Sequence, residues 1–161
     1  MLPLTQVEQF TRKHLRYNVI FNMIDGGFFG FAIGFASFST VLPLFVASMT
    51  DSATLIGLVP AIHGAGWLLP QLFTANRTAQ LRRYKRTVLR NTIHERLPFL
   101  GFALVAFLLP TVGAEIGLVL TFIFLIWHGL GGGFTANPWT SMISKIMPPE
   151  NRGTFFGLQA A

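Results

Sequence analysis

Residues 76–96, NRTAQLRRYKRTVLRNTIHER, carry seven of the twelve lysines and arginines in a chain of 161 residues. An apolar run ending in PQLFTA precedes this segment, and a second apolar run, LPFLGFALVAFLLP, follows it directly. A soluble domain normally has about 25% charged residues, whereas 11% of these residues are charged and 52% are hydrophobic. This composition predicts an integral membrane protein in which the basic segment lies outside the bilayer, between two spans.

Four apolar segments are as long, or nearly as long, as a helix that crosses a bilayer, which needs about 20 residues. They lie at about 26–48, 54–75, 97–112 and 116–137, and a further apolar stretch begins at about residue 154. The third is short, but the helical periodicity before it predicts a basic amphipathic helix that runs from the membrane surface into it. The predicted fold is therefore all-α and integral to the membrane, with four transmembrane helices and the start of a fifth. Residues 1–25 form an amphipathic N-terminal segment, and residues 26–161 form the transmembrane domain.

The basic residues all fall on one side of this predicted topology. Three precede the first span, seven lie between the second and third, and the last two, Lys145 and Arg152, follow the fourth. The remaining two connections contain only Asp51 and Glu115 as charged residues. Because basic loops resist translocation, this distribution predicts a multi-pass protein of the cell membrane with a cytoplasmic N-terminus, in contact with anionic lipid on that face. It argues against the nucleic-acid binding that a net charge of +6 would otherwise suggest.

Sequence patterns for enzymatic chemistry are missing. His94-Glu95 lacks the second histidine of the zinc-protease pattern HExxH, and there is no GxSxG, P-loop or GxGxxG. No carboxylates or histidines have the spacing of metal ligands, and the chain has no cysteine. We therefore expect no enzyme, metal or cofactor. Three classes remain: a transporter, a small four-helix structural or assembly protein without transport activity, and a membrane enzyme whose chemistry lies in sequence missing here.

Small residues recur in the first and fourth predicted spans. Gly26, Gly30 and Gly34 form a repeated small-xxx-small pattern, which allows another helix to approach the backbone closely. Gly131 and Gly132 lie in the fourth span, which is followed by Pro138. Tight packing alone is one interpretation. The other is that both helices flex beside a cavity that opens and closes, since glycine and proline weaken a spanning helix.

A few polar residues within or beside the spans are candidates for a substrate or proton pathway. They are His128, His63, Asn137, Gln71 and Asp25. Counting along the helices places both histidines near the midplane, where an ionisable group is a functional candidate. The alternative for each is a neutral imidazole hydrogen-bonded to the backbone or a hydroxyl of a neighbouring helix. Asp25 is either the N-cap of the first span or a coupling carboxylate.

The chemistry of the spans favours an uncharged cargo. Apart from Asp25 they contain no acidic or basic residue, while Ser37 and Ser39 add hydrogen-bonding groups to an aromatic-rich surface. This combination suits a neutral or amphipathic organic solute. His128 is the preferred proton-linked group, because an imidazole with an ordinary pKa of about 6.5 changes charge around neutral pH.

Two stretches resemble the major facilitator superfamily of transporters. GGGFTANPWTSMISKIMPPENRGTFFG, residues 131–157, is similar to the end of that family's fourth helix and the following cytoplasmic loop, with matches at Pro149, Arg152 and Gly153. TVLPLFVASMTDSATLIGLV, residues 40–59, resembles the end of its first helix, the short outer loop and the start of its second helix. The order, spacing and sidedness of these motifs agree over nearly the whole chain.

The loop between the second and third spans departs from the family's pattern, G-x-x-x-D-(R/K)-x-G-(R/K)-(R/K). Asn76 stands at the acidic position beside Arg77, and Arg82 and Arg83 match the final basic pair only after a two-residue insertion. The departure indicates a divergent branch, or a different use of the basic cluster.

The resemblance implies a function as well as a fold. It implies the N-terminal half of a twelve-helix bundle, so that the chain is expected to be a fragment whose partners are the missing C-terminal helices. It also implies secondary active transport of a small organic solute by alternating access between two helical halves.

Overall fold

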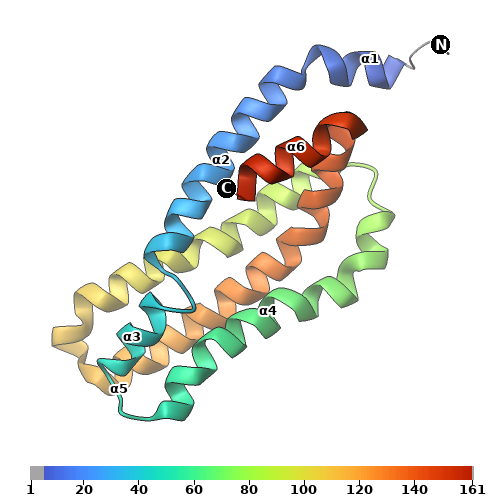
Figure 1. Ribbon diagram of the computed structural model, residues 1–161. Helices are drawn as coiled ribbons and strands as arrows, with labels where there is room; N and C mark the ends of the chain where they lie inside the picture. Colours follow the sequence, from blue (N-terminus) through green and yellow to red (C-terminus); the bar gives the residue numbers. More distant parts are fainter. Residues whose placement is uncertain (1–5, 161) are drawn as a thin grey trace.

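The computed structural model describes residues 6–160 and is all-α (Figure 1). Over these residues the helices are α1 (Gln6–Lys13), α2 (Leu15–Phe35), α3 (Val41–Ala47), α4 (Ala53–Ala79), α5 (Lys85–Ile146) and α6 (Pro149–Ala160). Three of them, α2, α4 and α5, are long and apolar enough to cross a membrane. The prediction of an all-α chain with membrane-crossing helices is confirmed to this extent.

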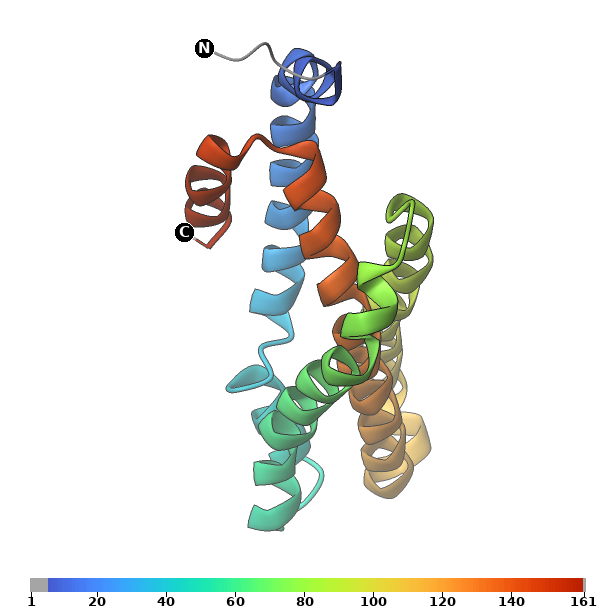
Figure 2. The same ribbon diagram turned by 90° about the vertical axis from the view of Figure 1, so that its right-hand side faces the viewer.

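The longest helix, α5, is a hairpin of two antiparallel arms, residues 85–112 and 114–146 (Figures 1 and 2). The arms meet at Gly113, whose φ of 82° and ψ of 168° lie in a region open only to glycine. They pack closely, since a Cβ added to Gly101 would lie 2.4 Å from the Phe124 ring. The predicted third and fourth spans lie one in each arm. From Lys85 on, the basic segment continues into the third span as one helix, whereas residues 76–79 end α4 and residues 80–84 form a loop.

The first predicted span, 26–48, is interrupted between α2 and α3. Pro43 accounts for the break, because in a continuous helix its ring would clash with the carbonyl of Ser39 and it has no N–H to donate. The hydroxyls within the break bond one another, with Thr40 Oγ1 donating to Ser37 Oγ at 2.8 Å, an alternative to helical backbone bonding. The break also turns Phe38 inward, where the residue is 6% exposed.

Two clusters of buried side chains join the helices. The first connects the break, α3, α4 and both arms of α5, and consists of Phe38, Leu42, Val46, Val59, Phe102 and Leu125. The second consists of Ile143, Met147 and Phe155, and joins the end of α5 to α6, with Val19 and Met23 of α2 packed against it. Figure 2 shows α6 beside α2, on the side away from α4. The broken first helix therefore contributes α3 to one cluster and α2 to the other.

The charged connections are segregated along the bundle (Figure 1). The loop 80–84 and the link 147–148 lie at one end, while the loop 48–52 and the turn at Gly113 lie at the opposite end. The basic loop is thus separated from Asp51 and Glu115 by the length of the helices. Which end faces the cytoplasm stays a prediction.

Candidate functional site

The two candidate histidines lie side by side beneath an aromatic ring. His63 comes from α4 and His128 from the second arm of α5, and their ring centroids are 5.5 Å apart with 10° between the planes. Phe38 stacks on both, at 3.9 Å from His63 and 4.7 Å from His128. At 5.5 Å apart, the two imidazoles leave no room for a ring between them. Phe38 therefore lies over both rings from one side. The break in the first helix therefore covers both histidines.

His128 is fully buried and uses only one of its two ring nitrogens. Its Nδ1 lies 2.7 Å from the backbone carbonyl oxygen of Glu95 in the first arm of α5. A carbonyl oxygen only accepts, so Nδ1 carries a proton and donates it, and in the neutral ring Nε2 is an acceptor. Nε2 has no hydrogen-bond partner among the described residues, and neither has Nδ1 of His63. Nδ1 of His128 thus forms the hydrogen bond to a backbone group that one interpretation expected, whereas Nε2 remains without a partner among the described residues.

Glu95 contributes to this site through its backbone carbonyl, and its side chain is buried as well. The residue is 5% exposed, and its carboxyl group faces the second arm of α5, where a Cβ on Gly132 would lie 3.5 Å from Oε1. In the same arm, Thr135 donates 2.8 Å to the Gly131 carbonyl of its own helix. A signal was present in the sequence, because Val88, Glu95 and Phe102 recur every seven residues and share one buried face of the helix.

Asp25 forms an ion pair across the bundle with Arg96. The Arg96 guanidinium donates to the two carboxylate oxygens at 2.7 and 2.8 Å. The N-cap interpretation of Asp25 is wrong, because α2 begins at Leu15 with His14 as its N-cap. Arg96 lies in the first arm of α5, in the part of the basic segment that was predicted to run as a helix into the third span. The one acidic residue among the predicted pathway candidates is therefore paired with a basic residue of the hairpin.

Asn137 and Gln71 meet at the contact between α4 and the second arm of α5. The Asn137 amide donates 2.8 Å to the backbone carbonyl of Gln71, and the Gln71 amide donates 2.8 Å to the carbonyl of Trp67. Gln71 lies about two helical turns from His63 along α4. These two residues are therefore brought together with each other rather than with the histidines.

The predicted flexible glycines divide into two groups. A Cβ on Gly131 would lie 2.5 Å from the His94 carbonyl oxygen, and one on Gly132 would lie 2.4 Å from the Trp67 ring. Close packing therefore explains both, and Pro138 is buried nearby in the same arm. A Cβ on Gly30 or Gly34 would meet no described atom within 4 Å. In the same helix, Gly26 faces the side chain of Gln159.

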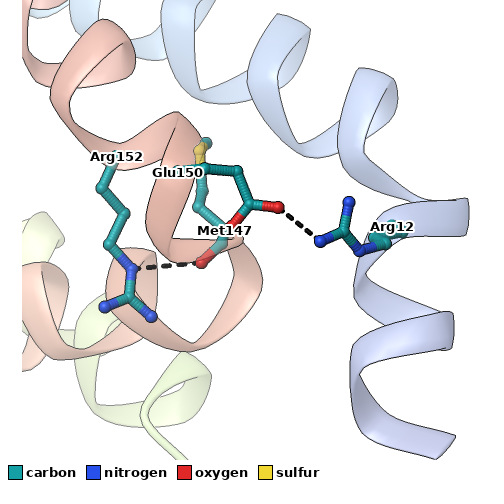
Figure 3. Close-up of polar contacts among 4 residues, drawn as sticks. All are labelled: Arg12, Met147, Glu150 and Arg152. Atoms are coloured by element: carbon teal, nitrogen blue, oxygen red, sulfur yellow. Dashed lines mark hydrogen bonds and ion pairs between the residues drawn. The ribbon is translucent and has the colours of Figure 1, made fainter. Parts of the chain in front are cut away.

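The motif at residues 149–153 caps the hairpin (Figure 3). Arg152 Nε donates 3.1 Å to the Met147 carbonyl, and its Nη2 donates to the carbonyl of Ser144. These carbonyls lie at the C-terminal end of α5, where backbone acceptors lack helical partners. Glu150 pairs with Arg12 of α1, which ties α1 to α6 (Figure 3). Pro149 is the first residue of α6, a position at which its missing N–H costs nothing, and Gly153 has open space at its Cβ position.

The loop residues that depart from the family pattern make few contacts. Asn76 Oδ1 accepts a long hydrogen bond, 3.4 Å, from Gln80. Arg77, Arg82 and Arg83 are exposed, and within residues 6–160 no carboxylate pairs with them. A carboxylate-based latch at this loop is therefore not formed by the described residues.

Comparison with known proteins identifies a family for the chain as a whole. The sequence model of the Major Facilitator Superfamily matches residues 3–161. No curated protein and no solved structure gives a significant match. The resemblance carried by residues 40–59 and 131–157 is thereby confirmed.

Proposed function

Because the chain belongs to the Major Facilitator Superfamily, whose members are multi-pass membrane proteins that carry out secondary transport and are not enzymes, we propose that it serves the transport of a small neutral or amphipathic organic solute. Its helices form part of one half of a bundle that alternates access between the two sides of the membrane. The N-terminus and the loop 80–84 face the cytoplasm, as the distribution of basic residues indicates.

The free Nε2 atom of His128 carries this proposal. The residue is 0% exposed, and leaving a buried acceptor unpaired costs about 1–3 kcal/mol. Phe38 and Phe99 flank the imidazole, with ring centroids 4.7 and 4.8 Å away, so the site is apolar apart from a few hydrogen-bonding atoms. A hydroxyl or N–H group of an organic solute, or a proton, would supply the missing partner.

The groups that face His128 determine what a proton would meet there. His63 stacks beside it from α4, and the backbone carbonyl of Glu95 accepts from its Nδ1 from the first arm of α5. The Asp25–Arg96 pair joins that arm to α2. A proton on Nε2 would create an N–H group with no acceptor in this arrangement, and an unpaired buried charge is costly. Proton uptake therefore favours a second conformation in which Phe38 moves aside or the solute supplies an acceptor. This coupling would link a proton to the conformational change.

The test uses the intact transporter, which combines this chain with the remaining helices of its bundle, in proteoliposomes that contain the pH-sensitive dye pyranine. Neutral and amphipathic organic solutes are added under an imposed pH gradient, and both solute uptake and proton entry are followed. We expect His128→Gln to abolish proton-driven uptake, whereas the matched control His14→Gln, at the start of α2, leaves it intact. A pH-gradient response that survives in His128→Gln contradicts the proton role, and transport restricted to multiply charged anions contradicts the substrate class.

A further inference from the structure

A separate cavity of about 920 Å³ lies between α4 and the two arms of α5. It does not include His63, His128 or Phe38 and so is distinct from the histidine pair. Its wall contains both basic and aromatic or aliphatic side chains, among them Arg77, Arg86, Arg90, Trp127, Leu130 and Phe134.

The charge in this cavity is uncompensated. Arg86, Arg90 and His94 follow at four-residue intervals on one face of α5, and Arg77 faces them from α4. No carboxylate lines the cavity. Within residues 6–160 the three arginines have no ion-pair partner, whereas Arg96, next to His94 in sequence, is paired with Asp25. The cavity therefore presents several positive groups to whatever fills it.

The cavity changes character along the hairpin. Two hydrogen bonds between the arms show which residues lie opposite each other along the hairpin. The Asn91 amide donates 2.9 Å to the Phe134 carbonyl, and Trp127 Nε1 donates 3.3 Å to His94 Nδ1. Arg86 and Arg90 precede these contacts and lie nearer the loop 80–84. Trp127 lies further along the hairpin, toward its middle. One end of the cavity is thus basic and close to the helix ends, and the other end is apolar.

We propose that this cavity binds the phosphate group of an amphiphilic phosphate ester, supplied by an anionic phospholipid of the surrounding bilayer. Arginine guanidinium groups match phosphate oxygens in geometry and charge, and basic pockets between membrane helices at headgroup level bind anionic lipid headgroups. An acyl chain would then contact Trp127, Leu130 and Phe134. A free phosphate ion would use the arginines and leave this apolar wall without a partner, which favours the lipid as the source.

The first test measures lipid binding to the purified full chain by native mass spectrometry. Phosphatidylglycerol and phosphatidylcholine with the same acyl chains are titrated separately. Arg86→Gln/Arg90→Gln removes two charges from the cavity, and the matched control Arg82→Gln/Arg83→Gln removes two charges from the same segment outside it. We expect the cavity variant to lose phosphatidylglycerol affinity by about tenfold or more and the control by about twofold or less. Equal losses in the two variants would show diffuse surface attraction and overturn the proposal.

A second test needs no change to the arginines and so does not depend on how those variants fold. Phosphatidylglycerol with brominated acyl chains should quench the fluorescence of the chain, and Trp127→Phe should remove that quenched component while Trp139→Phe should not. Inorganic phosphate should fail to displace the lipid. Quenching independent of Trp127, or displacement by inorganic phosphate alone, overturns the lipid assignment. Neither test measures transport, so their failure would leave the proposed function standing.

Discussion

Arg96 in the first arm of α5 donates to both carboxylate oxygens of Asp25 in α2, at 2.7 and 2.8 Å. The same guanidinium lies 5.5 Å from the centre of the Phe29 ring, also in α2. The amide of Asn18 adds a second polar link, a hydrogen bond of 3.0 Å to the Ile146 carbonyl. The ion pair therefore fixes α2 against the first arm of the hairpin, in addition to the contacts of Val19 and Met23 with the cluster of Ile143, Met147 and Phe155.

Removing either charge of this pair should loosen α2. Asp25→Asn or Arg96→Gln should each lower the free energy of unfolding by up to about 1 kcal/mol, since the two side chains are 47% and 39% exposed. The double variant should lose clearly less than the sum, because the remaining charge no longer lacks a partner. Thermal unfolding in detergent measures all three variants. Additive losses would mean that the two residues act independently.

Gly131 and Gly30 should respond in opposite directions to an added methyl group. Gly131→Ala should destabilise the fold by about 1–3 kcal/mol, as overpacking does, because its Cβ would lie 2.5 Å from the His94 carbonyl oxygen. Gly30→Ala meets no described atom within 4 Å and should stabilise α2 by about 0.5–1 kcal/mol through helix propensity. Unfolding by titration with a denaturing detergent compares them. A loss of equal size at both positions would contradict this account.

A larger side chain at Gly30 tests close approach to another helix during transport. Gly30→Leu should leave membrane insertion unchanged and should not lower the stability of the chain, since the Cβ position is open, yet it should reduce transport in the intact transporter. Gly132→Leu cannot separate the two effects, because the new side chain would displace the Trp67 ring. Unaltered uptake in Gly30→Leu would show that neither bending nor close packing is needed there.

The turn of the hairpin depends on Gly113. Its φ of 82° and ψ of 168° cost any other residue about 1–3 kcal/mol, so Gly113→Ala should lower stability by that amount. Gly64→Ala is the control, because Gly64 is helical and also has open space around its Cβ position. Matching thermal shifts for the two variants would rule out backbone strain at the turn.

The orientation in the membrane can be measured with single cysteines, since the native chain has none. Asp51→Cys and Glu115→Cys should react with an impermeant maleimide in intact cells, and Gln80→Cys should react only after the cells are permeabilised. Gln80 is exposed, which makes it a better probe of the basic end than Thr78, which is buried at 5% exposure. The reverse labelling pattern would invert the proposed topology.

Hydropathy and charge were sufficient to predict the hairpin and the segregation of the basic connections. The apolar runs on either side of Gly113 are long enough to be recognised, and the turn between them contains no basic residue. The break at residues 36–40 was missed, although Pro43 lies four residues after Ser39 and so predicts a disrupted helix at that point. Continuous hydropathy through 26–48 concealed it, because a short kinked segment can be as apolar as a straight one.

The partners of Glu95 and Arg96 were missed for a different reason. Both residues fall in the segment predicted to run as a basic helix into the third span, and composition alone does not show which charges in it find partners. Arg96 pairs with Asp25, seventy-one positions earlier in the chain, and the carboxyl group of Glu95 faces Gly132 in the opposite arm. Such long-range pairing follows from how the helices pack, which a single sequence does not specify.

The break that separates α2 from α3 divides the first membrane pass between two groups of helices. α3 is held by α4 and the hairpin, whereas α2 is held by α6, the end of α5 and the Asp25–Arg96 pair. A tilt of α2 about residues 36–40 would leave the α3–α4 contacts in place while pulling on Phe38, which lies across His63 and His128. A displacement at the basic end of the bundle would thus reach the two imidazoles as a sliding of one ring over two others, with no need for the helices that carry the histidines to move.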